Sequence, residues 1–491
     1  MIQHYQNRLT ATLACVAVAL VNGCSSSNSS PTVPPPTPAR ATPIAHVIVL
    51  FQENRSFDNL FAGFPGADTA MSGRCIPNAA RAPRCQSGKL VPLHAITLQT
   101  SGTIGAGMDI QHDHAGFETE FNRGKMDGFD LIRTGTTGAG SWAGTYPYAY
   151  VERSQTKPYW DLARTYALAD HMFSTATTDS FVAHQEIIAG TTKLNADESL
   201  TNTPSGIPWG CDAPSGTVTA VLTTDRKVLP AAGPFPCFTQ YRTMADVLDA
   251  ASVSWKFYVE SDNGGNPDSD FSGNVWNGFD AIEKIRCASF ESQTQNCIGF
   301  GPDWRTHISE PNSNVLRDIK NETLPQVSWV IPTLADSDHP ASGSDTGPSW
   351  VTSVVNAVGR STYWKNTVIL VLWDDWGGFY DNVPPPQLDY TSLGMRVPLI
   401  VVSPYAKRGY VSHTPYETGS ILKYIEQTFN TASLGSTDVR ANSIADALDY
   451  SQMPARFTSI RAPYPASFFL SHRSFPTSRF VLEHDGGIIP E

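Results

Sequence analysis

The chain has 491 residues, of which 46 are acidic and 34 are basic, and its formal net charge is −12. With this charge and no basic run, the composition argues against nucleic acid as the natural partner and against tight electrostatic docking on anionic lipid. A chain of this length can hold two domains, but α/β enzymes with large loop insertions often use it for one.

Residues 1–24 have the pattern of an export signal, with basic positions followed by an apolar run at residues 9–21. That run is too short for a permanent membrane span, which needs about 20 apolar residues. Cys24, preceded by glycine, resembles the cysteine of a bacterial lipobox, and simple secretion is the alternative. The Ser/Pro-rich residues 25–43 then predict an extended linker. We therefore expect an exported protein that is periplasmic, secreted or held at the outer membrane through a lipidated Cys24.

Two of the eight cysteines, Cys15 and Cys24, fall in the signal, and the other six form three couples that are close in sequence. Each couple lies in a stretch rich in glycine, proline or asparagine. In an oxidising compartment this spacing favours three local disulfides, although other connectivities stay open. The couples are Cys75/Cys85, Cys211/Cys237 and Cys287/Cys297.

Short apolar runs alternate with helix-like segments from residue 44 onward. The runs are continuous rather than alternating, which indicates strands covered on both faces. They occupy residues 46–51, 253–259, 326–331, 367–373 and 397–402, and the helix-like segments occupy 244–250, 349–358 and 420–429. This order predicts an α/β sandwich with a mostly parallel central sheet flanked by helices.

Three long stretches, at residues 62–110, 190–240 and 260–312, carry the cysteine couples. They are interpreted as loops stapled by disulfides rather than as separate domains. One catalytic domain is therefore expected over residues 44–461. Residues 462–491 lose periodicity and are expected to pack on this domain as a tail.

Polar clusters follow two of the predicted strands, Glu53-Asn54 after the first and Asp374-Asp375 after the fourth. Ligands bind at the carboxyl ends of strands in open α/β sheets. Carboxylate and amide oxygens are also the ligands of a hard divalent cation. Taken alone, the first cluster is also a plain helix start and the second a solvated strand end. Together they predict a metal site.

A hydroxyl-rich segment at residues 169–190 includes Ser180. A serine or threonine beside a metal ion loses proton affinity and becomes a nucleophile, whereas the simpler interpretation is a cap before a helix. Histidines in polar loops, His112 and His339 among them, are the available general acids, although loop histidines are often only exposed. Motifs of serine α/β-hydrolases, P-loop proteins, zincins and dinucleotide enzymes are absent.

Five motifs follow one another between about residue 43 and residue 460. They are HVIVLFQENRSFDNLF, GKMDGF, ADHMF with SFVAHQ, SDHP, and TVILVLWDDWGGFYDNV. In this order they resemble the bacterial phosphoesterase family of phosphocholine-type phospholipases C and a respiratory acid phosphatase. The resemblance implies an alkaline-phosphatase-like core, a divalent metal ion of unspecified identity, and a serine or threonine that takes the phosphoryl group.

The resemblance also implies a role for each matching residue. Ser180 is implied as the nucleophile, although Thr178 or Thr177 compete because the usual Gly-Pro before it is replaced. His112 and His339 are implied as catalytic groups that transfer protons or contact phosphate. The implied metal ligands are Glu53, Asn54, Ser180, Asp374 and Asp375, and the implied substrate-binding residues are His184 and Lys284.

The expected function is that of an extracytoplasmic, metal-dependent phosphoester hydrolase of the phospholipase C type, with a metal-activated Ser180 and a phosphoserine intermediate. Its expected partners are a phospholipid or a small phosphoester. Two alternatives stay open: an acid phosphatase that acts on phosphomonoesters, and a non-catalytic surface lipoprotein with the same fold.

Overall fold

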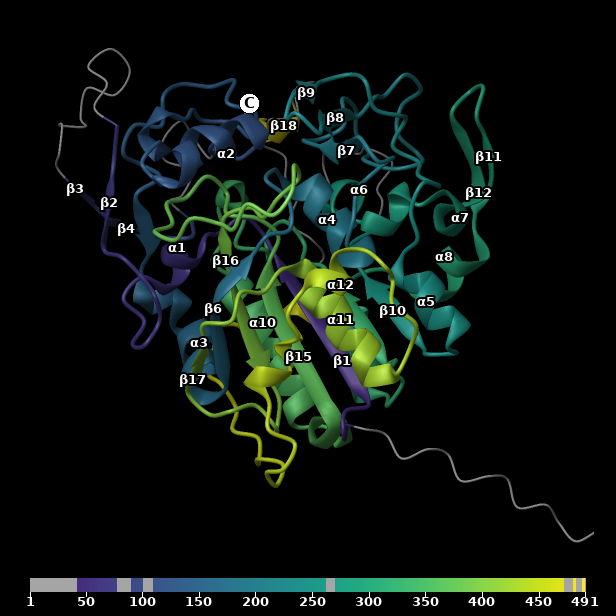
Figure 1. Ribbon diagram of the computed structural model, residues 1–491. Coiled ribbons are helices and arrows are strands. Elements are labelled where there is room, and N and C mark those ends of the chain that lie inside the picture. Colours follow the sequence, from purple (N-terminus) through teal and green to yellow (C-terminus); the bar gives the residue numbers. More distant parts are fainter. Residues whose placement is uncertain are drawn as a thin grey trace, which may run out of the picture. The chain divides into compact units, whose positions relative to one another are not determined.

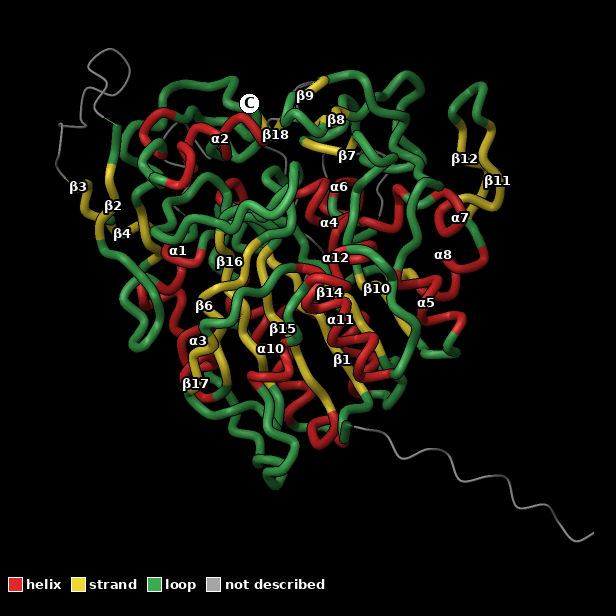
Figure 2. Tube along the Cα trace, in the orientation of Figure 1, coloured by secondary structure: helices red, strands yellow, loops and turns green. Residues whose placement is uncertain are grey.

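An eight-stranded sheet forms the centre of the protein in the computed structural model (Figures 1 and 2). All neighbouring strands run parallel except one, which is antiparallel to both of its neighbours. In sheet order the strands are β13 (Ile308–Ser309), β10 (Trp255–Tyr258), β14 (Val327–Val330), β1 (His46–Gln52), β15 (Thr367–Trp373), the antiparallel β16 (Arg396–Val402), β6 (Ala167–Phe173) and β17 (Tyr410–Ser412). The predicted α/β class with a mostly parallel central sheet is confirmed.

The structure describes residues 42–76, 90–99, 109–261, 270–471, 480–482 and 488–490. The predicted signal, Cys24 and nearly all of the predicted linker lie outside these residues. From Thr42 onward the chain forms one compact unit. In the described part of the chain, no helix combines the length and the apolar character that crossing a membrane requires.

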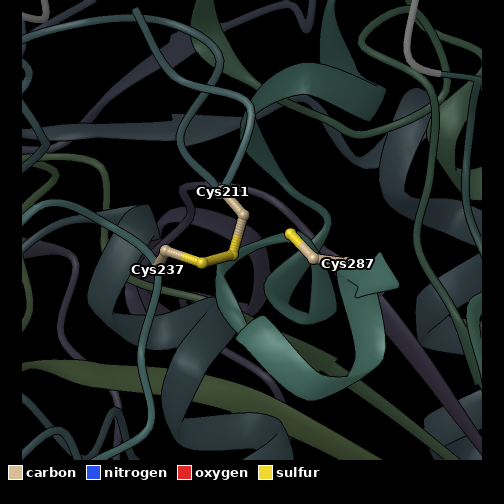
Figure 3. Close-up of side chains that lie close together, drawn as sticks. All are labelled: Cys211, Cys237 and Cys287. Carbon is tan, nitrogen blue, oxygen red and sulfur yellow. A yellow bond between two sulfur atoms is a disulfide. The ribbon is translucent and has the colours of Figure 1, made fainter. Parts of the chain in front are cut away.

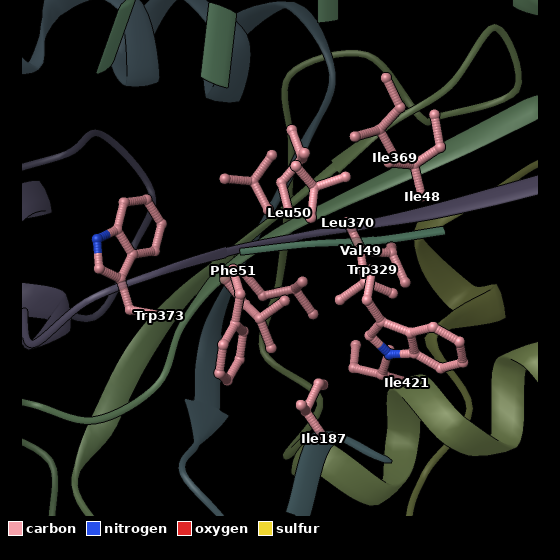
Figure 4. Packing of buried hydrophobic residues seen from close by; sticks show 14 of the residues in the cluster. Ile48, Val49, Leu50, Phe51, Ile187, Trp329, Ile369, Leu370, Trp373 and Ile421 are labelled. Atoms are coloured by element: carbon pink, nitrogen blue, oxygen red, sulfur yellow. The ribbon is translucent and has the colours of Figure 1, made fainter. Parts of the chain in front are cut away.

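The central strands are buried along nearly their whole length because helices cover both faces of the sheet. β15 is buried at all seven residues, and β1 at every residue after His46. Figure 4 shows Phe51 and Trp329 from the strands packed near Ile187 and Ile421 from helices. Continuous apolar runs therefore indicated the strand positions because both faces of each strand need apolar side chains.

Two groups of helices pack against the sheet. One group contains α3 (Arg153–Thr165), α9 (Asn314–Lys320) and α10 (Gly347–Gly359), and the other contains α4 (Ser180–Ala189), α5 (Met244–Ala250) and α11 (Thr418–Phe429). The helix predicted at residues 244–250 has the same bounds as α5. Those predicted at 349–358 and 420–429 lie within the longer α10 and α11.

Shorter elements lie outside the central sheet and its main helices, and those within residues 62–110, 190–240 and 260–312 occupy the segments that were interpreted as loops. The strands are β2 (Ser72–Arg74), β3 (Leu90–Pro92), β4 (His94–Ile96), β5 (Ala149–Val151), β7 (Glu198–Thr201), β8 (Ala220–Thr223), β9 (Val228–Leu229), β11 (Cys287–Glu291), β12 (Asn296–Phe300), β18 (Phe480–Leu482) and β19 (Ile488–Pro490). The helices are α1 (Phe57–Phe61), α2 (His114–Phe121), α6 (Ser272–Val275), α7 (Glu283–Arg286), α8 (Pro302–His307), α12 (Thr437–Arg440) and α13 (Ala466–Ser471).

Two of the three predicted disulfides are present, Cys211–Cys237 and Cys287–Cys297. The third prediction includes Cys85, which lies outside the described residues. Figure 3 shows the sulfur of Cys287 beside the Cys211–Cys237 bridge. The two disulfides therefore join neighbouring segments of the structure rather than isolated loops.

Candidate active site

The two predicted polar clusters lie side by side because β1 and β15 pair in parallel. The pairing runs from His46 opposite Thr367 to Gln52 opposite Trp373. The residues that follow these two strands, Glu53 and Asp374, therefore leave the sheet at the same edge. The backbone N–H of Asn54 donates a hydrogen bond to Asp374 Oδ1 over 2.7 Å. The structure thus brings together residues that are 320 positions apart in sequence.

A glycine turn lets the backbone after β15 approach Asn54. Gly377 has a φ of +60°, a region that residues with a side chain rarely adopt. A Cβ atom at this position would lie 2.3 Å from the carbonyl oxygen of Asn54. The N–H of Gly377 donates to Asp375 Oδ1 over 2.7 Å, which fixes that carboxylate. Only glycine therefore fits this position without moving Asn54.

Ser180 lies at the first residue of α4, directly after the N-cap Asp179. Its hydroxyl donates to Asp375 Oδ2 over 3.3 Å and accepts from Asn54 Nδ2 over 3.3 Å. It also stands at the positive end of the α4 dipole, where free backbone N–H groups favour an anion. Ser180 is therefore a buried hydroxyl at the junction of both clusters.

The two threonines that compete with Ser180 have other partners. Thr178 exchanges hydrogen bonds with Asn202 through its hydroxyl, each of 2.9 Å. The hydroxyl of Thr177 lies 2.9 Å from Nδ1 of His114. These contacts direct both threonines away from the carboxylates that surround Ser180.

His112 is buried with its Nε2 atom toward the cluster. Its Nδ1 lies 2.6 Å from the carbonyl oxygen of Ile110, and its Nε2 lies 3.0 Å from Nδ2 of Asn54. Nε2 is also 3.8 Å from Asp109 Oδ2 and 3.9 Å from Asp375 Oδ2. Burial alone would lower the pKa of His112, but these two carboxylates outweigh it and raise the pKa to about 10. The imidazole can therefore hold a proton beside Ser180.

His339 approaches the side chains around Ser180 from a different loop. Its Nε2 lies 3.5 Å from Oδ2 of Asp109, which also accepts a hydrogen bond from Thr136. Burial lowers the pKa of His339, although the Asp109 carboxylate acts in the opposite direction. Asp109 thus contacts both histidines, and our sequence analysis did not single it out. Its position three residues before His112 was the available signal.

His184 lies one helical turn after Ser180, with its ring stacked on Trp276. Its Nε2 is 3.1 Å from Oε1 of Glu53. Ligand atoms from His184, Glu53 and Asp374 all lie within 4.8 Å of one another. Burial lowers the pKa of His184 to about 4, so the ring is neutral and offers a nitrogen lone pair. These contacts place His184 beside Glu53 and Asp374, two of the predicted metal ligands, whereas the resemblance implied a contact to substrate.

Lys284 is not brought to this cluster. It lies on α7, where it is about half exposed and forms an ion pair with Asp246 of α5. The family motif placed it in the site by position alone. The structure therefore gives no support to its expected contact with substrate.

The grouped carboxyl and amide oxygens fit a divalent cation. Glu53 Oε2, Asn54 Oδ1 and Asp374 Oδ2 are buried without a hydrogen-bond partner among the described residues. Buried oxygens without partners are costly unless a ligand satisfies them. Burial, followed by the charges of neighbouring carboxylates, raises the pKa of Glu53 well above its ordinary value. A cation would offset this repulsion, and oxygens with one imidazole suit several divalent metals.

A small cavity of about 30 Å³ opens beside Ser180. This volume holds about one or two water molecules. Its polar and aromatic lining comprises Asp109, His112, Thr136, Asp179, Ser180, Thr203, Trp209, Phe271, Val275, Trp276 and His339. Among these, burial raises the pKa of Asp179 to about 7. The cavity therefore places the hydroxyl, both histidines and a buried carboxyl group around one space.

The fold and this cluster define an α/β protein with an oxygen-rich site at the carboxyl ends of its central strands. The model of the phosphoesterase family matches residues 44–432, so the chain belongs to that family.

Two curated relatives share about a quarter of their aligned sequence with this chain. The hemolytic phospholipase C of Pseudomonas aeruginosa is 26% identical over 439 residues, which cover 79% of this chain and 53% of that protein. Phospholipase C A of Mycobacterium tuberculosis is 26% identical over 443 residues, covering 84% and 78% respectively. The chain thus spans about half the length of the first relative.

Among solved structures, the protein is similar to a member of the alkaline phosphatase superfamily from Vibrio parahaemolyticus. The TM-score is 0.32 with 10% sequence identity, and the match covers 71% of this chain and 78% of the other.

Proposed function

We propose that this chain is a metal-dependent phosphoester hydrolase of the phospholipase C type that uses Ser180 as its nucleophile. The observation that carries the proposal is the position of the Ser180 hydroxyl, between the amide of Asn54 and the carboxylate of Asp375. The names of its phospholipase C relatives support a phosphodiester substrate. Membership of the phosphoesterase family supports the reaction class.

The metal ion would be held by residues at the ends of β1 and β15, with one histidine from α4. These residues are Glu53, Asn54, Asp374, Asp375 and His184. When bound, a divalent cation would polarise the phosphoryl oxygens and favour ionisation of a neighbouring hydroxyl. Its identity is not specified by these donors.

The residues of the chain then divide the reaction between them. Asp375 Oδ2 accepts the hydrogen bond of Ser180, orients its oxygen, and takes the hydroxyl proton as that oxygen attacks phosphorus. The N-terminus of α4 stabilises the charge on the phosphoryl group. The protonated Nε2 of His112 gives its proton to the departing alcohol. Water then hydrolyses the phosphoserine: its proton returns to His112, and Asp375 returns its proton to the departing oxygen of Ser180.

The first experiment compares two chromogenic substrates. Hydrolysis of p-nitrophenylphosphorylcholine and p-nitrophenyl phosphate is measured with EDTA and after addition of divalent metals. We expect metal-dependent turnover that is faster on the diester. Faster turnover of the monoester would identify an acid phosphatase instead. Absence of turnover of both substrates in every divalent metal would refute the enzymatic proposal.

The second experiment tests the nucleophile with a matched pair of hydroxyl deletions. Ser180→Ala is expected to lower kcat by about 10³-fold or more, because the attacking oxygen is lost. Thr178→Ala, two residues earlier, is expected to stay within a few-fold of the wild type. Wild-type rates in Ser180→Ala would move the nucleophile elsewhere.

We also propose that the protein is exported and anchored through a lipid on Cys24. The pairing of Cys211 with Cys237 and of Cys287 with Cys297 supports an oxidising compartment. In a bacterial host, radiolabelled palmitate should enter the wild-type chain but not Cys24→Ser. Equal labelling of both chains would contradict the anchor, and a protein retained in the cytoplasm would contradict export.

A further inference from the structure

A second cluster of possible metal ligands lies at the edge of the central sheet, outside the cavity beside Ser180. Asp170 and His171 belong to β6, and His413 follows directly after the edge strand β17. One ligand atom from each residue lies within 4.8 Å of the other two. None of the three takes part in the proposed hydrolysis.

An irregularity in the sheet explains why two consecutive residues of β6, Asp170 and His171, lie on the same side. Neighbouring residues of a regular strand point to opposite faces. The register of β6 against β16 shifts between Val397 and Leu399, so that Asp170 and His171 together oppose the single residue Pro398. Proline has no N–H to donate to the ladder, and a bulge of this kind redirects side chains. The local sequence of β16 thus supports the convergence of Asp170 with His171.

Each carboxylate oxygen of Asp170 contacts one imidazole nitrogen. His171 Nδ1 lies 2.7 Å from Oδ1, and His413 Nδ1 lies 2.8 Å from Oδ2. The N–H of Asp68 donates to Oδ2 over 2.7 Å. Asp170 is fully buried.

The arrangement around these atoms also has the features of a metal site. The far nitrogen of His171, Nε2, lies 3.9 Å from Asp68 Oδ2, so a carboxylate stands near this ring without a hydrogen bond to it. The side chain of His413 is 60% exposed, which leaves an approach from solvent. Two imidazoles with one carboxylate are donors that suit zinc and other divalent transition metals.

We propose that Asp170, His171 and His413 form a second metal site, which binds a divalent transition metal ion such as zinc. Each imidazole binds the ion through a deprotonated Nδ1: a neutral ring moves its proton from Nδ1 to Nε2, and a protonated ring releases its second proton to solvent. The ion links the end of β17 to the middle of β6. The segment after β6 leads to α4 and Ser180, so the site stabilises the strand that precedes the proposed nucleophile.

The test counts metal ions on the full chain without a histidine tag. Protein treated with EDTA is dialysed against zinc, and bound zinc per chain is measured by mass spectrometry of the metal. His413→Gln removes an exposed ligand and leaves the core intact. His94→Gln, on an exposed histidine of β4, is the matched control. We expect His413→Gln to bind one equivalent less than the wild type, and His94→Gln to bind the same amount as the wild type.

Two further readouts separate a metal site from a simple hydrogen-bonded cluster. Zinc should raise the melting temperature of His94→Gln more than that of His413→Gln. Cobalt should give ligand-field absorption in the wild type that is weaker in His413→Gln. Equal zinc counts in His413→Gln and His94→Gln would overturn the proposal. Both variants should hydrolyse the chromogenic substrates at wild-type rates. A negative result for the second metal site would therefore leave the proposed function untouched.

Discussion

Replacement of Gly377 by alanine tests whether the turn after β15 positions Asn54. The new Cβ would lie 2.3 Å from the carbonyl oxygen of Asn54, and ordinary contact begins near 3.4 Å, so the two must separate by about 1 Å. A displacement of about 1 Å in a catalytic site costs on the order of 10²-fold in rate. The positive φ adds about 1–2 kcal/mol of backbone strain. We therefore expect a folded enzyme with about 10²-fold lower kcat/KM.

Gly144→Ala is the matched control, because Gly144 has the same φ of +60° and no atom near its Cβ position. It carries the backbone strain without the contact to Asn54. Turnover of p-nitrophenylphosphorylcholine and urea unfolding are measured for both variants. Equal rates in Gly377→Ala and Gly144→Ala would refute the reasoning, because strain alone would then explain the outcome.

Three other predictions concern stability, each measured by urea unfolding. Arg396→Met removes the partner of the fully buried Asp381, which lies 2.7 Å from Arg396 Nε, and should lower the unfolding free energy by about 3–5 kcal/mol. Burial raises the pKa of Glu426 to about 7, so the wild type should lose stability between about pH 4.5 and pH 7 more steeply than Glu426→Gln. Replacing Cys211 and Cys237 by alanine opens a connection of 26 residues and should cost about 3.5 kcal/mol.

Each of these predictions has an outcome that contradicts it. A loss below about 1 kcal/mol in Arg396→Met would mean that solvent reaches Asp381, and Asp381→Asn added to this variant should recover part of the loss. Stability falls as the pH rises because the unfolded chain ionises Glu426 near its ordinary pKa of 4.5, whereas the folded chain keeps the proton to about pH 7. Parallel pH profiles for the wild type and Glu426→Gln would reject this assignment. Unchanged stability without the disulfide would indicate residual structure in the unfolded chain.

The strands that are apolar along their whole length were predictable from the sequence, whereas β6, whose apolar run is interrupted, was not. β15 has the predicted bounds, 367–373, because seven apolar residues follow one another in its sequence. β6 was missed because Asp170 and His171 interrupt its apolar run. Its pairing with β16 includes the register shift opposite Pro398, which strand propensity does not predict. The alternation of strands and helices fixed the class, but it did not predict the antiparallel direction of β16.

The candidate site was predictable where its residues directly follow strands. Glu53 and Asp374 belong to this group, since parallel neighbours end at the same edge of the sheet. Asp109 was not recognised because it lies in a loop, and only the folded chain brings it within reach of His339. Lys284 is the opposite case, since a motif position suggested a place in the site while the fold pairs it with Asp246.

The pairing of β1 with β15 also makes the site sensitive to the folding of the whole chain. Asn54 and Asp374 are 320 residues apart, and closing a loop of this length costs on the order of 5 kcal/mol in chain entropy. Most other elements of the sheet and its helices lie within that loop, so their packing must offset this entropy before the site forms. A proteolytic fragment that ends before β15 lacks Asp374 and Asp375, two of the five residues proposed to hold the metal ion. Catalytic activity would therefore report the fraction of chains that are folded from β1 to β15.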